Sequence, residues 1–165
     1  MMLTLGDRAF LNEVPLFAGF DKSELATISN YLEAHEYEPG QVVIWSDSDH
    51  RSLYVLAHGS AVVTIQIRGE VESVLAHLGP GAHFGELTFI DGKPASGTVT
   101  AETACRVLVV PIAGMRALRD EQSPLFGKLA WAMLKDLAAK LRATNDKVLD
   151  AVQWGLDAAQ IDPSA

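Results

Sequence analysis

Hydrophobic and polar positions follow three successive patterns along the chain. Near the N-terminus, Asp21-Lys22-Ser23-Glu24 has the spacing of a capping box, and Leu25, Ile28 and Leu32 follow at helical intervals. From about residue 34 the pattern changes to short alternating or β-branched runs, and after Pro111 it returns to helical spacing. This order predicts a short helix, then many strands, then more helix.

Short runs between residues 35 and 111 have the composition of β-strands. They are Gln41–Trp45, Leu53–Ala57, Ala61–Ile67, Val71–Leu78, Gly97–Ala101 and Arg106–Val110. Turn-forming residues separate them, at Pro39-Gly40, Ser46–Asp49, Gly59, Arg68-Gly69, Gly79–Gly81 and Asp91–Pro94. Many short strands at close spacing are typical of antiparallel barrels and jelly rolls. We therefore expect a mainly β fold, an antiparallel β-roll with flanking helices.

Two helices are predicted after the last strand. The first has Pro111 in its first turn, and the second begins at Ser123-Pro124, where serine is a good cap and proline suits the first position. The second helix contains no breaker until about Trp154. About 30 residues at ~1.5 Å each make a rod of about 45 Å, which is longer than a small domain needs to cover itself.

A mostly apolar heptad pattern runs along the second helix. Its successive a and d positions are Leu134, Leu137, Leu141, Thr144, Val148 and Ala151. Such a seam predicts pairing with an identical helix in a parallel homodimer. The alternative is that the same residues pack on the β-roll of their own chain. We divide the chain into a domain over residues 1–122, a long dimerisation helix over 123–156 and a tail over 157–165.

Composition limits the possible partners and the compartment. The 165-residue chain has a net charge of −8, and the phosphate backbone of nucleic acid repels a net anion, so direct nucleic-acid binding is not expected. No apolar run is long enough to span a bilayer and the N-terminus lacks a leader pattern, which predicts a cytoplasmic protein that does not bind membranes. Cys105 is the only cysteine and lies in an apolar run, so we expect it to be buried and unreactive.

The chain contains no pattern that indicates an enzyme or a bound metal. It has no nucleophile elbow, phosphate-binding P-loop or dinucleotide fingerprint, so no catalytic residues are predicted. Its histidines lack the spacing of a zinc site, and the Asp47–Asp49 turn lacks the glycine and glutamate of a calcium loop. We expect no metal and no cofactor.

The most informative stretch is His83–Val99, which reads HFGELTFIDGKPASGTV. It resembles the phosphate-binding cassette of cyclic-nucleotide-binding domains, as found in catabolite activator proteins and kinase regulatory subunits. That pattern is Phe-Gly-Glu-Leu, a short helical turn, and then arginine and a small residue before a strand. The resemblance covers nearly the whole chain, and the long helix corresponds to the C-helix of the family. It implies a β-roll that senses a small ligand, with cyclic AMP or cyclic GMP as the candidate.

The resemblance also assigns candidate ligand-binding residues. Gly85 allows a ligand to approach the backbone closely, and Glu86 offers a carboxylate to a ribose hydroxyl. Leu87 and Ser96 hold positions that donate hydrogen bonds to the phosphate. The family's arginine is replaced by Ala95. Leaving a buried charge without its partner costs about 3–5 kcal/mol, which would weaken micromolar binding to millimolar or worse.

Two questions about this site stay open from the sequence. Arg51, Lys93 or His83 could supply the missing positive charge from another direction. On the long helix, Thr144 and Asn145 match the pair that contacts the adenine base in catabolite activator proteins, or else Thr144 sets the helix register and Asn145 is simply exposed.

The leading hypothesis is a sensor or regulatory module with weakened or altered cyclic-nucleotide binding, dimeric through the long helix and acting on an unknown protein partner. The rival is a ligand-free module for dimerisation or protein interaction. A further alternative is a truncated relative of catabolite-activator-type transcriptional regulators. The sequence ends at Ala165, before a helix-turn-helix of that family could form.

Overall fold

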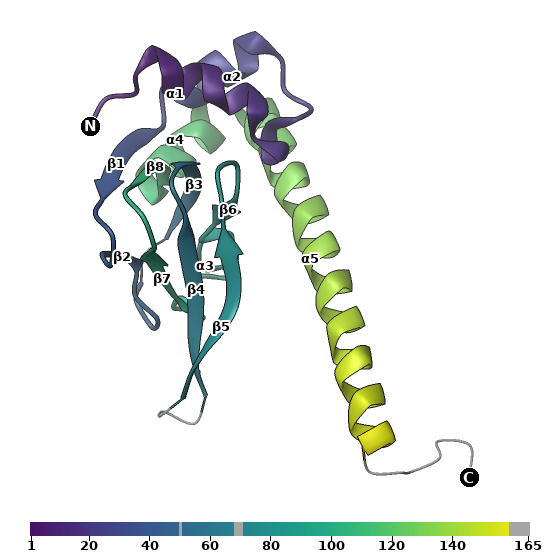
Figure 1. Ribbon diagram of the computed structural model, residues 1–165. Helices are drawn as coiled ribbons and strands as arrows, with labels where there is room; N and C mark the ends of the chain where they lie inside the picture. The colour runs from purple at the N-terminus through teal and green to yellow at the C-terminus, as the bar shows by residue number, and fades with distance from the viewer. Residues whose placement is uncertain (50, 68–70, 159–165) are drawn as a thin grey trace. The chain divides into compact units, whose positions relative to one another are not determined.

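The computed structural model describes residues 1–49, 51–67 and 71–158, and the predicted Arg68-Gly69 turn lies outside them. Its helices and 3-10 turns are α1 Leu5–Phe10, η1 Leu11–Glu13, η2 Pro15–Phe17, α2 Lys22–Ser29, α3 Glu86–Asp91, α4 Ile112–Glu121 and α5 Ser123–Ala158. Its strands are β1 Glu33–Tyr37, β2 Val42–Ile44, β3 Ser52–His58, β4 Ala61–Ile67, β5 Val71–Leu78, β6 His83–Phe84, β7 Thr98–Ala101 and β8 Cys105–Pro111. Figure 1 shows these elements along the chain.

The strands form two antiparallel four-stranded sheets, in the orders β1-β8-β3-β6 and β2-β7-β4-β5. Side chains alternate between the two faces of each strand. Leu56 and Val107 of the first sheet and Ala61 and Val99 of the second are buried in one apolar cluster. The core of the roll therefore lies between the sheets. The predicted antiparallel β-roll is confirmed, and each of the predicted strand runs falls on a strand.

Strand β1 was not predicted from the sequence. Its residues read Glu-Ala-His-Glu-Tyr, and within it only Ala34 is fully buried. The strand forms because its backbone pairs with β8 over five residues, with His35 opposite Val107. This pairing links residues far apart in the chain, so no local pattern of hydrophobic residues reveals it.

Of the three helix starts predicted from the sequence, one agrees with the structure and two differ in detail. The predicted capping box at α2 is confirmed, because the side chain of Asp21 accepts from the N–H of Glu24 at 2.9 Å and Glu24 accepts from the N–H of Asp21 at 2.8 Å. Pro111 precedes α4 as its N-cap instead of lying in its first turn. Ser123 is the first residue of α5 and not its cap, since its hydroxyl donates to the carbonyl of Arg119.

Cys105 is buried, as expected. It is 4% exposed, its thiol donates to the carbonyl of Ser60 at 3.1 Å, and burial raises its pKa. A thiol reacts as the thiolate, so a raised pKa lowers its reactivity near neutral pH.

The chain divides into two compact units, Met1–Leu129 and Ala130–Ala165. The first contains both sheets, α1 to α4 and the start of α5; the described part of the second is the rest of α5. Along that helix, the predicted seam residues Leu134, Leu141 and Val148 are each more than half exposed. Among the described residues, no helix combines the length and apolar character needed to cross a membrane.

Candidate functional site

Two glycines bracket the short helix α3 in the cassette. Gly85, with φ of 83°, lies before α3, and Gly92, with φ of 68°, ends it. A Cβ atom at Gly85 would lie 2.6 Å from the carbonyl oxygen of Ser52 and 2.7 Å from the ring of Tyr54. Tyr54 in turn stacks on Phe84, with ring centroids 5.2 Å apart. Only glycine fits this position, because both its backbone conformation and the space around it exclude a side chain.

A cavity of about 150 Å³ opens beside α3. It is lined by Ile44, Val63, Phe84, Gly85, Glu86, Leu87, Thr88, Ala95, Ser96, Gly97 and Val99. The structure thus brings together all five site residues that the sequence predicted within the first unit. Gly85, Glu86 and Leu87 lie at the start of α3, and Ala95 and Ser96 lie in the loop before β7. Both segments line this cavity.

The charge of the cavity lining differs from what an anionic ligand needs. Among the described residues that line it, Glu86 is the only one with a titratable side chain, and it is 6% exposed. Ala95 is 7% exposed and contributes no polar side-chain group. The lining therefore holds one buried carboxyl group and no cationic side chain.

Ala95 is held in place by the turn at residues 46–49. Its N–H donates to the carbonyl of Ser48 at 3.0 Å, and its carbonyl accepts from the N–H of Asp47 at 2.9 Å. Asp47 adopts a positive φ of 60°, which aspartate tolerates better than most residues. The sequence indicated a turn at 46–49, but not that this turn positions the cassette loop some 50 residues later.

None of the three residues considered as substitutes for the missing arginine lines the cavity. Arg51 donates from Nη2 to the carbonyl of Gly92 at 3.2 Å and from Nε to Asp49 at 3.1 Å. Lys93 is exposed. His83 lies in β6, just before Phe84, and one of its ring nitrogens lies within 4.8 Å of a carboxylate oxygen of Glu86. That one of the three residues supplies the missing positive charge to a ligand stays a prediction.

Thr144 and Asn145 lie on α5 in the second unit. The hydroxyl of Thr144 donates to the carbonyl of Lys140 at 2.9 Å, a local bond one turn back along the helix. Whether these two residues contact a ligand stays a prediction.

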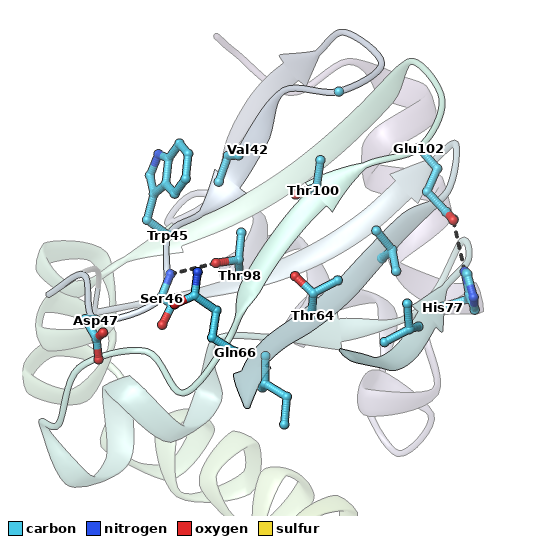
Figure 2. Close-up of a pocket in the computed structure, with 14 residues that line it drawn as sticks. Val42, Trp45, Ser46, Asp47, Thr64, Gln66, His77, Thr98, Thr100 and Glu102 are labelled. Atoms are coloured by element: carbon cyan, nitrogen blue, oxygen red, sulfur yellow. Dashed lines mark hydrogen bonds and ion pairs between the residues drawn. The ribbon is translucent and has the colours of Figure 1, made fainter. Parts of the chain in front are cut away.

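A second hollow, of about 810 Å³, lies on the other face of the β2-β7-β4-β5 sheet (Figure 2). Val99 and Ala101 of β7 point into the core, so Thr98 and Thr100 between and beside them line this opposite face. The exposed ring of Trp45 lies at one end of the hollow. It contains none of the predicted site residues.

A family model for the cyclic nucleotide-binding domain matches residues 34–122, more than half of the chain. The cAMP-dependent protein kinase regulatory subunit of Mycosarcoma maydis is 35% identical over 123 residues, which is 73% of this chain and 23% of that protein. The chain therefore spans about a quarter of the length of this relative.

Solved structures show the same fold. A cyclic nucleotide-binding domain from Methylobacillus flagellatus has a TM-score of 0.78 and 22% identity, over 88% of this chain and 82% of that one. The catabolite activator protein of Thermus thermophilus has a TM-score of 0.74 and 28% identity, over 84% of this chain and 63% of that one.

A third structure is the regulatory subunit of a cAMP-independent protein kinase A from Trypanosoma brucei. Its TM-score is 0.68 and its identity 23%, over 78% of this chain and 44% of that one. The same subunit with three substitutions, one of them threonine to arginine, was solved with cAMP bound. With the matched family model, the two four-stranded sheets and the cassette cavity beside α3, the chain belongs to the cyclic nucleotide-binding domain family.

Proposed function

We propose that this domain is a regulatory module whose cassette cavity takes cyclic AMP or cyclic GMP with much lower affinity than a cavity that carries the arginine. The observation that carries the proposal is the lining of the cavity, where Ala95 holds the arginine position and Glu86 is the only described titratable group. The other predicted contacts, Gly85, Leu87 and Ser96, are all present at the cavity.

The weakening follows from the charge of the ligand. A cyclic phosphate carries one negative charge, and a guanidinium neutralises it with two parallel hydrogen bonds. Without that partner the phosphate is placed near a buried carboxyl group, and the cost of about 3–5 kcal/mol is a loss of roughly a hundredfold to several thousandfold in affinity. The trypanosome subunit agrees with this reasoning: it is cAMP-independent, and the version bound to cAMP carries three substitutions, one of which introduces an arginine.

The proposed mechanism is a shift between two arrangements of the module when the ligand binds. Thr144 and Asn145 of α5 would contact the base, and the heptad seam of α5 would hold two chains in a homodimer. The partner that reads this change is a protein of unknown identity. We propose neither an enzymatic reaction nor direct binding to nucleic acid, and a cytoplasmic location stays a prediction.

Isothermal titration calorimetry with cyclic AMP and cyclic GMP tests the proposal on the full chain and on Ala95→Arg. The matched control is Ala26→Arg, which adds the same side chain and charge at an exposed position of α2. We expect millimolar or undetectable binding by the native chain and the control, and about micromolar binding by Ala95→Arg. Micromolar binding by the native chain would overturn the role assigned to Ala95.

The second candidate function is a ligand-free module for dimerisation or protein interaction. The observation that favours it is the absence of a cationic side chain from the described cavity lining, combined with the exposed leucines of α5. Titration with adenosine, which lacks the phosphate, separates the two functions. If neither cyclic nucleotides nor adenosine bind any of the three proteins, the ligand-free module is favoured and the sensor is rejected.

A further inference from the structure

A separate cavity of about 370 Å³ lies on the opposite end of α3 from the cassette cavity. It is lined by Arg51, Phe89, Ile90, Asp91, Gly92, Ile112, Met115, Arg116, Arg119 and Phe126. All of these residues belong to the first unit, and they come from the end of α3, from α4, from the first turns of α5 and from the residue before β3.

The floor of this cavity is apolar. Met115 is fully buried, and Phe89, Ile112 and Phe126 are partly buried around it. Aromatic rings in such a lining provide a large contact area for a flat apolar body. The volume lies within the range of about 300–1,000 Å³ that small-molecule sites occupy.

The rim is rich in arginine although the chain as a whole carries a net charge of −8. Arg51, Arg116 and Arg119 line the cavity together with a single acidic residue, Asp91. Two of the guanidinium groups already have hydrogen-bond partners. Arg51 contacts Asp49 and the carbonyl of Gly92, and Arg119 donates to its neighbour Asp120 at 2.8 Å. A guanidinium has five N–H donors, so these contacts leave donors for a further acceptor.

We infer that this cavity binds a small organic anion, a carboxylate or sulfonate carried on a flat apolar body. The apolar body packs on Phe89, Met115 and Phe126, and the anionic group accepts hydrogen bonds from the arginines at the rim. Bidentate contacts between arginine and a carboxylate are among the strongest in proteins, and an apolar surround strengthens them.

The site is distinct from the cassette cavity, although α3 contributes to both. Leu87 and Thr88 line the cassette cavity, whereas Phe89 and Ile90, one step further along the helix, line this one. The inference therefore does not depend on the proposed binding of cyclic nucleotides.

The test is a titration of the ¹⁵N-labelled full chain with 1-naphthoate, followed by NMR chemical shifts. We expect a dissociation constant below about 1 mM, with the largest shifts at Gly92 and Arg116 and small ones at Ser96. The uncharged analogue 1-naphthalenemethanol should bind at least roughly tenfold more weakly, because it cannot make charge-assisted hydrogen bonds. This comparison uses only the native protein, so it does not depend on any variant folding.

The double variant Arg116→Gln/Arg119→Gln should weaken 1-naphthoate roughly tenfold or more and leave 1-naphthalenemethanol nearly unchanged. The control Arg142→Gln/Lys147→Gln removes the same charge from exposed positions of α5 and should leave both affinities unchanged. The inference is overturned if naphthoate does not bind, if the acid and the alcohol bind equally well, if the control acts like the double variant, or if the shifts map to another surface.

Discussion

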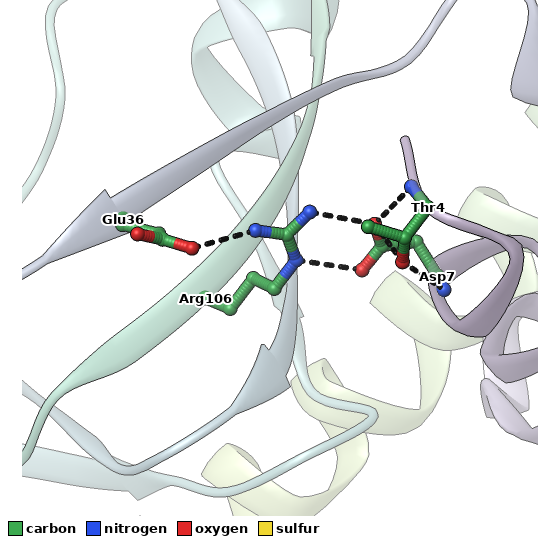
Figure 3. Close-up of polar contacts among 4 residues, drawn as sticks. All are labelled: Thr4, Asp7, Glu36 and Arg106. Carbon is green, nitrogen blue, oxygen red and sulfur yellow. Dashed lines mark hydrogen bonds and ion pairs between the residues drawn. The ribbon is translucent and has the colours of Figure 1, made fainter. Parts of the chain in front are cut away.

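Arg106 on β8 holds Asp7 of α1 with two hydrogen bonds of 2.7 Å each, from Nε to Oδ1 and from Nη2 to Oδ2 (Figure 3). The carboxylate of Asp7, which is 5% exposed, also accepts from the N–H and the hydroxyl of Thr4. The remaining terminal nitrogen of Arg106 donates to Glu36 on β1 at 2.8 Å. The helix before the roll is therefore attached to the central part of one sheet by a partly buried ion pair.

Replacing Asp7 by asparagine should lower the free energy of unfolding by about 2–4 kcal/mol at neutral pH. The change leaves the guanidinium of Arg106 partly buried beside a neutral group and removes the charge-assisted bonds. Urea unfolding followed by circular dichroism measures the difference. The control Glu36→Gln removes the exposed partner of the same arginine and should cost less than about 1 kcal/mol. Equal effects of the two changes would contradict the importance of burial.

The same ion pair predicts how stability depends on pH. The hydrogen bonds from Arg106, with smaller contributions from Thr4, hold the pKa of Asp7 well below its ordinary value of 3.8. Because the folded-state pKa is lowered, the stabilisation is complete above the unfolded-state value and is lost as pH falls below about 4.

The native chain and Asp7→Asn should therefore differ most in unfolding free energy above about pH 5, and the difference should shrink in more acidic solution. Urea unfolding of both proteins across this range gives the measurement. If the difference stays constant down to about pH 2, folding does not lower the pKa of Asp7, and the prediction is wrong.

Gly85→Ala should destabilise the protein by about 1–3 kcal/mol and distort the cassette cavity. Alanine at a φ of 83° is strained, and its Cβ would collide with the carbonyl of Ser52 and the ring of Tyr54. Gly79→Ala is the control, since a Cβ there meets no atom within 4 Å. The control should change the stability by less than about 1 kcal/mol. The melting temperatures of both variants, measured by thermal unfolding, test this prediction. Equal melting temperatures would refute the steric argument.

Leu141→Glu should convert a homodimer to a monomer in analytical ultracentrifugation, because it places a charge in the predicted seam of α5. Leu141 is 62% exposed and Leu149, outside the seam, is 66% exposed. Leu149→Glu is thus the matched control and should leave the mass unchanged. The seam prediction fails if the native chain sediments as a monomer or if Leu141→Glu keeps the mass of the dimer.

Much of the roll could be predicted because its strands carry local patterns. Leu53, Val55 and their neighbours in β3 form an apolar run, and β7 alternates between buried and partly exposed residues, so short stretches of sequence sufficed. Gly85 and Ala95 were assigned through the resemblance of the cassette to the family motif, which is also local. The five cassette residues named from the sequence line one cavity in the structure, and their role in ligand binding stays a prediction.

Other features depended on parts of the chain that are distant in sequence. Strand β1 has little apolar character and exists through its pairing with β8. The backbone of Ala95 is held by a turn that precedes β3. Arg51 contacts the carbonyl of Gly92 and does not line the cassette cavity.

The sequence alone therefore determined the fold class, the strand runs and the residue types at the cassette, because periodicity, turn chemistry and a short motif are properties of neighbouring residues. Only the tertiary structure decided that Asp7 pairs with Arg106, that no described cation lines the cassette cavity, and that three arginines surround an apolar cavity beside α3. The physical reason is that ion pairs and cavities form between elements that meet when the whole chain folds, and side chains at such meeting points obey no local periodicity.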